Sequence, residues 1–122
     1  MIQDIKACLK ELFPNMTFLG YTKNDDLDAM VVIKNTPVIQ TYQIDQSRIR
    51  EGIGFLIYDK NVVQAEQNYQ QLQNYFLITK PSDLAIPNNR IVNTSIASGG
   101  QVDYDDKRRL MFQLTIQFEK EM

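Results

Sequence analysis

The sequence has no histidine and a single cysteine, Cys8, among its 122 residues. Histidine is the commonest general base near neutral pH and the commonest metal ligand. Its absence, together with the single cysteine, excludes zinc sites and the Cys–His or Ser–His pairs that activate nucleophiles. One cysteine also excludes a disulfide within the chain, so nothing in the sequence requires an oxidising compartment. Catalysis by a carboxylate, a lysine or a tyrosine remains open.

Long apolar runs are also missing. No segment approaches the ~20 apolar residues of a membrane helix, and residues 1–12 lack the basic start and the apolar stretch of a signal peptide. The net charge is −2, so there is no basic excess to hold a polyanion. Hydrophobic residues make up 43% of the chain, which is ordinary for a globular protein. We expect one soluble, cytoplasmic domain that spans residues 1–122.

Two amphipathic helices are predicted from apolar residues at steps of three and four. The first covers residues 2–13 and ends at Pro14. The second follows Asn61, which can cap it, with Gln64 completing a capping-box pattern, and it ends before Pro81. The apolar stripe of this second helix consists of Val62, Ala65, Tyr69, Leu72 and Phe76.

Four further segments have the length and composition of strands. They are residues 29–33, 53–58, 91–97 and 110–118. Residues 98–100 indicate a turn or bulge, after which residues 101–104 resume the third strand. Residues 37–50 have no clear apolar face, and we expect an extended arm or an edge strand there. The order of these elements predicts an α+β fold, in which an antiparallel β-sheet of about four strands carries two α-helices packed on one face.

The last predicted strand alternates strictly between apolar and mostly polar residues. Its apolar positions are Leu110, Phe112, Leu114, Ile116 and Phe118. We expect this side to pack against both helices. The opposite side contains Gln113, Thr115 and Gln117, which are polar but uncharged. The alternation therefore predicts one face in the core and one neutral face toward water.

Acidic residues gather before this strand. Asp103, Asp105 and Asp106 could bind a divalent cation with Glu51 or Glu119, because hard cations prefer several oxygen ligands. The alternative is a solvated turn in which the acids pair with neighbouring cations. These cations are Lys107, Arg108 and Arg109. The spacing of an EF-hand is absent, which favours the turn.

No other segment has a catalytic pattern. Residues 24–28 form a second acidic turn, which Asn and Asp side chains stabilise through their own backbone. The glycines at 52–54 and 99–100 lack the spacing of a phosphate-binding loop. We therefore expect a protein that is not an enzyme, holds no metal or cofactor, and works by assembling with other proteins.

Three stretches, taken in order, resemble the family of phage tail terminator and minor capsid proteins found at head–tail junctions. They are DAMVVIKN (28–35), the strand-turn-helix unit IGFLIYDKNVVQAEQNYQQLQNYF (53–76) and the closing unit GGQVDYDDKRRLMFQLTIQFE (99–119). The resemblance covers nearly the whole chain and depends on patterns, not on invariant residues. Two departures are Tyr58-Asp59, where many members have a basic residue and alanine, and residues 37–50, which lack a Gly/Pro-rich stretch.

The resemblance implies a ring, commonly a hexamer, in the virion of a tailed phage or prophage, assembled in the host cytoplasm. Such a ring ends the tail tube and joins it to the head-completion or stopper protein, while DNA passes through its lumen without sequence-specific binding. On this basis the candidate lumen-facing residues are Gln113, Thr115 and Gln117. The candidate subunit or partner contacts are Tyr42, Arg48, Arg50, Asp105, Lys107 and Arg108.

Two alternatives remain open at this point. One is a tail-completion or tail-tube component, or a prophage-derived secretion component, with a related fold. The other is a small α+β enzyme or ligand-binding domain, which needs a deep pocket with convergent polar groups. The missing histidine and the lack of a nucleotide-binding motif argue against the second alternative.

Overall fold

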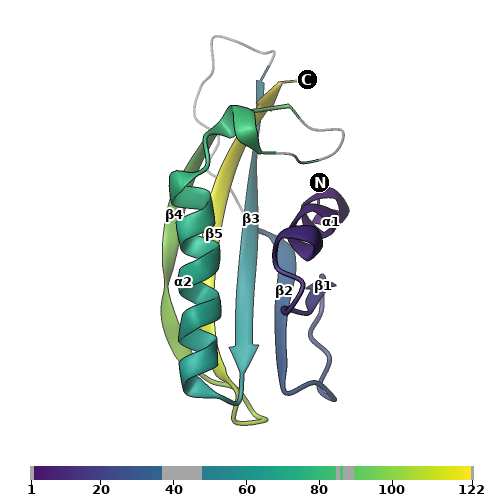
Figure 1. Cartoon of the computed structure of the whole chain (residues 1–122), viewed down its shortest axis with the longest axis vertical. Coiled ribbons are helices and arrows are strands. Elements are labelled where there is room, and N and C mark those ends of the chain that lie inside the picture. Colours follow the sequence, from purple (N-terminus) through teal and green to yellow (C-terminus); the bar gives the residue numbers. More distant parts are fainter. Residues whose placement is uncertain (1, 37–47, 85, 87–89, 122) are drawn as a thin grey trace.

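The computed structural model describes residues 2–36, 48–84, 86 and 90–121. Two helices, five strands and one short 3-10 helix make up this part of the chain (Figure 1). In chain order they are α1 (Ile2–Leu12), β1 (Phe18–Gly20), β2 (Ala29–Thr36), β3 (Arg48–Asp59), α2 (Val62–Ile78), η1 (Pro81–Asp83), β4 (Ile91–Tyr104) and β5 (Leu110–Glu121). The α+β fold expected from the sequence is confirmed.

The sheet has five strands in the order β1-β2-β3-β5-β4, one more than the sequence predicted. The additional strand is β1, which pairs with β2 in parallel and makes the sheet mixed, whereas all other pairs are antiparallel. Three residues are too few to show an alternating pattern. Pairing with β2 produces this strand: Val31 donates its backbone N–H to the carbonyl of Thr17, and Tyr21 donates to that of Ile33, both at 2.8 Å.

Strand β3 is longer than predicted, whereas β4 has the predicted ends. Strand β3 begins at Arg48, inside the segment expected to be an arm, and residues 37–47 of that segment lie outside the described residues. At residues 98–100, where the sequence predicts a turn or bulge, the structure has an irregular strand: β4 continues through the glycines, with register shifts at three places along β5. Gly100 has φ of 142°, a conformation that side chains with a Cβ rarely adopt, so a glycine is needed at this irregular point.

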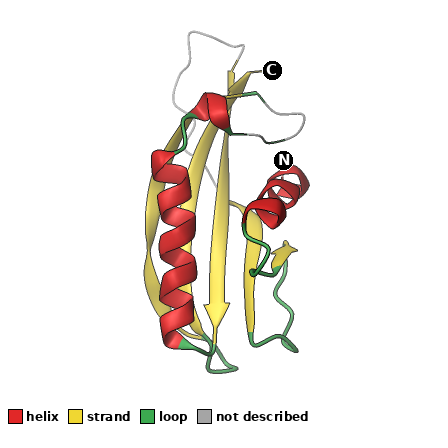
Figure 2. Ribbon diagram, viewed as in Figure 1, coloured by secondary structure: helices red, strands yellow, loops and turns green. Residues whose placement is uncertain are grey.

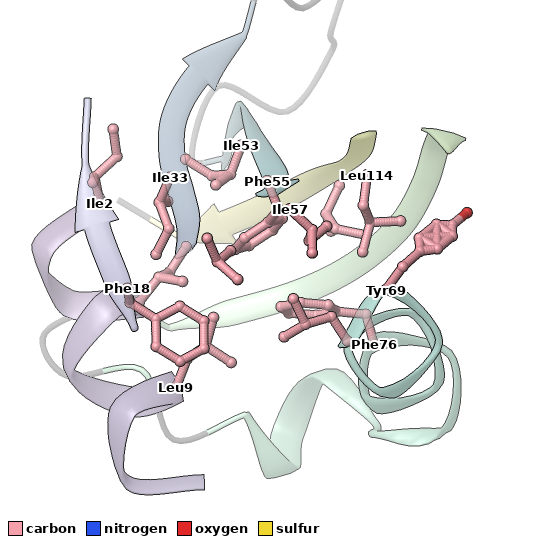
Figure 3. Packing of buried hydrophobic residues seen from close by; sticks show 14 of the residues in the cluster. Ile2, Leu9, Phe18, Ile33, Ile53, Phe55, Ile57, Tyr69, Phe76 and Leu114 are labelled. Atoms are coloured by element: carbon pink, nitrogen blue, oxygen red, sulfur yellow. The ribbon is translucent and has the colours of Figure 1, made fainter. Parts of the chain in front are cut away.

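Both helices pack on the same face of the sheet, as predicted, and the space between the layers is the main core (Figure 2). Helix α2 starts as the sequence indicated: the backbone N–H of Gln64 donates to Asn61 Oδ1 at 3.1 Å. From α2, Tyr69 stacks on Phe112 with ring centroids 4.9 Å apart. The ring centroids of Phe76 and Phe55 are 5.4 Å apart. Figure 3 shows Tyr69 and Phe76 of α2 among the side chains of the strands.

The alternation of β5 is confirmed on its helix-facing side. Leu110, Phe112, Leu114, Ile116 and Phe118 are all buried in the main core. Burial of each such side chain contributes on the order of 1.5–3 kcal/mol. The other side is less uniform than expected, because Thr115 is only 8% exposed while Gln113 and Gln117 are partly exposed. Gln113 covers this threonine by donating from Nε2 to Thr115 Oγ1 at 2.8 Å.

Candidate functional site

The face of the sheet opposite the helices, here called the open face, has an apolar half and a polar half. The apolar half is a small second core of Met30, Val32 and Tyr58, with Leu19, Leu27, Leu56 and Met111 packed against it. The polar half lies further along the same strands. In register there, Thr115 is opposite Gly54 and Ser98, and Gln117 is opposite Gly52 and Ser95.

The three candidate lumen-facing residues therefore share one surface, the polar half of the open face. Of the predicted contact residues, Arg50 lies on the same surface, opposite Glu119 in register and together with Gln117 around a shallow depression. Arg48 begins β3 opposite Glu121. Tyr42 lies outside the described residues. The structure thus places Arg50 on the same face as Gln113, Thr115 and Gln117, next to Gln117 alone of the three.

The remaining predicted contact residues lie in the β4–β5 turn at the other end of the sheet. Lys107 and Arg108 are exposed there, and Arg108 has a left-handed backbone with φ of 61°. Asp105 differs from them, because its side chain is only 7% exposed and accepts hydrogen bonds from within the chain. Its Oδ1 accepts the backbone N–H groups of Lys107 and Arg109 at 3.0 and 2.9 Å.

Arg109 is the residue that organises this turn, and the sequence reading did not separate it from its two basic neighbours. Its side chain is fully buried. Nε and Nη2 donate to Asp105 Oδ2 at 2.8 and 2.6 Å. Nη1 donates to the backbone carbonyls of Asn24 and Leu27 at 3.1 and 2.8 Å, and Nη2 also donates to Asp25 Oδ1 at 3.2 Å. All five guanidinium N–H donors are therefore used, and the turn is tied to residues 24–27.

Charges around this buried arginine are arranged to stabilise it. The guanidinium also lies 5.3 Å from the centre of the Tyr58 ring. Burial alone would raise the pKa of Asp105, but the hydrogen bonds from Arg109 and its positive charge outweigh burial and lower this pKa to about 2. Next to it, a hydrogen bond from Lys23 lowers the pKa of Asp106. The acids of this turn are thus occupied by cations of the same chain.

The pairing of Asp105 with Arg109 and of Asp106 with Lys23 favours the charge-paired turn over the metal site. Asp105 lies in the turn before β5, and Glu119 lies near the far end of that strand. A strand rises about 3.3 Å per residue, so the two carboxylates are roughly 30 Å apart. Glu51 instead pairs with Lys120 at 2.7 Å. In the second acidic turn, Asp26 donates its N–H to Asn24 Oδ1 at 2.9 Å, which is a turn stabilised by its own side chain. Among the described residues, no three side chains of metal-ligand type come together.

The chain is an α+β protein with a five-stranded mixed sheet that two helices cover on one face. Comparison with known proteins rests on this fold. No protein-family model and no curated protein matches the sequence. Among solved structures, a chain from the virion of a native gene transfer agent particle is similar, with a TM-score of 0.64 and 11% identity. The likeness covers 98% of this chain and 90% of that one.

A second solved protein, whose name gives no function, is similar over 98% of this chain and 95% of its own, with a TM-score of 0.60 and 13% identity. At these identities the comparisons establish the fold that the chains share. Within the part of the chain that the structure describes, no helix has the length and apolar character to cross a membrane.

Proposed function

We propose that this protein is a structural subunit of a tailed phage, a prophage or a phage-like particle, and that it forms a ring at the head–tail junction. The ring ends the tail tube and joins it to the head-completion protein, and the subunit acts by geometry and not by catalysis. The observation that carries the proposal is the likeness, over nearly the full length of both chains, to a chain of a gene transfer agent virion.

The chemistry of the open face supports a lumen-facing role for its polar half. Gln113, Thr115 and Gln117 are uncharged, and Arg50 is in register with the oppositely charged Glu119. The exposed Lys34 of β2, in register with Gly54, adds one cation to the same face. A lining rich in lysine would hold DNA phosphates through release of their counterions. A mostly neutral lining lets DNA pass without being held, as a connector requires.

The two edges of the sheet are compatible with a ring. A closed ring of more than two identical subunits needs two different patches that meet. One edge of this sheet is the three-residue strand β1, and the other is the long strand β4. The register shifts along β4 discourage simple addition of another strand. Subunits would therefore meet through side chains at two unlike edges.

The test is mass measurement in solution with negative-stain imaging of the purified protein, alone and mixed with tail tubes of the particle encoded by the same genome. Closed rings, or binding restricted to tube ends, are the expected result. Long filaments or discs would favour the tail-tube or tail-completion alternative. A strict monomer without affinity for tube ends would contradict the proposal.

A further inference from the structure

A cleft opens on the helix-covered side of the sheet, between the chain that follows α1 and the start of α2. Figure 1 shows the two elements that border it. Its volume is about 320 Å³, which is small for a metabolite site but sufficient for one long side chain. Asn15, Met16 and Thr17 line one wall, and Gln64 and Asn68 line the other. Asp59, the last residue of β3, also lines the cleft.

Asp59 is a buried carboxylate for which the described residues provide no cation. The residue is 6% exposed, and one carboxylate oxygen, Oδ1, accepts the backbone N–H of Asn61 at 2.8 Å. The adjacent Lys60 points elsewhere and pairs with Asp28 at 3.1 Å. Within the described part of the chain Oδ1 has this bond and Oδ2 has none, and Oδ2 is not one of the fully buried unpaired atoms there, so it is accessible from the cleft. A carboxylate that is largely buried and has no cation beside it would gain from a charged hydrogen-bond donor that enters the cleft.

The neighbouring side chains in the cleft present further acceptors. Asn68 is also buried, and its Oδ1 accepts from Gln64 Nε2 at 2.8 Å. That bond leaves the Oε1 atom of Gln64 and a second lone pair on Asn68 Oδ1 free to accept. Asp59, Gln64 and Asn68 therefore line the same small space, and Met16 supplies an apolar surface beside them.

We propose that this cleft, defined by Asp59, Gln64 and Asn68, binds an arginine side chain presented by a neighbouring protein subunit. A guanidinium group offers five N–H donors in a planar fork, which suits several oxygen acceptors around one carboxylate better than the compact ammonium of lysine. The arginine stem would cover Met16. The choice of a neighbouring subunit as the source depends on the proposed function, whereas the chemistry of the cleft does not.

The probe is Nα-acetyl-arginine amide, titrated into the isolated ¹⁵N-labelled protein and followed by NMR. The neutral analogue of the same shape, Nα-acetyl-citrulline amide, is the matched ligand. We expect saturable shifts at Asn61, Gln64 and Asn68 in the millimolar range with the arginine compound. The citrulline compound should bind at least tenfold more weakly, because it lacks the charge that pairs with Asp59.

Two variants separate the site from a general effect of charge. Asp59→Asn removes the charge, while its side-chain oxygen can still accept from Asn61, so the turn is retained; binding should weaken at least tenfold. Asp28→Asn removes an exposed carboxylate, 76% accessible, at the same end of the molecule and should leave binding unchanged.

Absence of saturation, equal binding of the two compounds, or equal weakening by both variants would each overturn the inference. Because the titration needs no assembly, its result is independent of whether rings form. Rings without arginine binding would overturn this inference alone. Arginine binding by a strict monomer that forms no rings and has no affinity for tube ends would contradict the proposed function and leave the chemistry of the cleft standing.

Discussion

Two charged side chains are buried at the end of the sheet where β3 finishes and β5 begins, and the chain treats them in opposite ways. Arg109 is fully buried and has an acceptor for each of its five donors. Asp59 is nearly as buried, but only one of its oxygens has a partner among the described residues. The two side chains differ in how many of their hydrogen-bond partners the same chain supplies.

Arg109 is completed by residues of the same chain. It links the β4–β5 turn to carbonyls more than 80 residues earlier in the sequence, which is the work of a residue that fixes the fold. Asp59 has no such link, and its free oxygen opens on a cleft. A buried charge that is fully paired within the chain fits a structural role. A buried charge that is incompletely paired needs another explanation, and for Asp59 the proposed one is an arginine of a neighbouring subunit.

Arg109→Leu should give the largest loss of stability, about 3–5 kcal/mol, because Asp105 Oδ2 and the carbonyls of Asn24 and Leu27 lose their guanidinium donors. Urea unfolding followed by circular dichroism measures it. Lys107→Ala, in the same turn but exposed, is the control and should stay within about 0.5 kcal/mol. If the two variants lost similar amounts, Arg109 would not be the residue that holds this turn.

Acid should weaken the same turn. The pKa of Asp105 is lowered from its ordinary value of 3.8 to about 2, so its ionised form stabilises the fold above pH 4. That stability is lost as the pH falls from about 4 through 2. After allowance for solvent screening, the loss is about 1–2 kcal/mol. Urea midpoints measured across this range should fall in the wild type and fall less in Asp105→Asn, and equal slopes would contradict the assignment.

Local pattern in the sequence was sufficient for much of the fold. The alternation from Leu110 to Phe118 predicted the buried face of β5, and Asn61 with Gln64 predicted the start of α2. Both signals depend on neighbours close in the chain. Strand β1 could not be found in this way, because pairing with β2 produces it. The sequence predicted a turn or bulge at Gly99 and Gly100 and the return of the strand after it, but only pairing with β5 shows that the strand is continuous there.

The candidate site shows the same division. The shared position of Gln113, Thr115 and Gln117 on one face follows from the period of a strand. The special role of Arg109 does not, because Lys107, Arg108 and Arg109 are alike in sequence and only one of them reaches the carbonyls of residues 24–27. The exposure of Thr115 was overestimated because Gln113, two residues away on the same face, covers it.

A lysine introduced on the open face should destabilise the protein more at a buried position than at a partly exposed one. Thr115→Lys puts an ammonium at a position that is 8% exposed, and we expect a loss of about 1–2 kcal/mol. Gln113→Lys and Gln117→Lys put it at partly exposed positions and should change stability by less than about 0.5 kcal/mol. Thermal unfolding of the three variants measures the difference. Insoluble protein from both glutamine variants would mean that this face is not open.

Asp59→Asn should change stability little, and the direction of the change tests whether its carboxylate serves the fold. The asparagine oxygen can still accept from Asn61, while the uncompensated buried charge is removed. We therefore expect stability in urea to be unchanged or to rise by up to about 1 kcal/mol at neutral pH. Asp105→Asn is the matched comparison and should be destabilising, because its carboxylate is paired with Arg109. If Asp59→Asn lost as much as Asp105→Asn, the carboxylate of Asp59 would be serving the fold, and the cleft would have no unpaired charge to offer a neighbouring subunit.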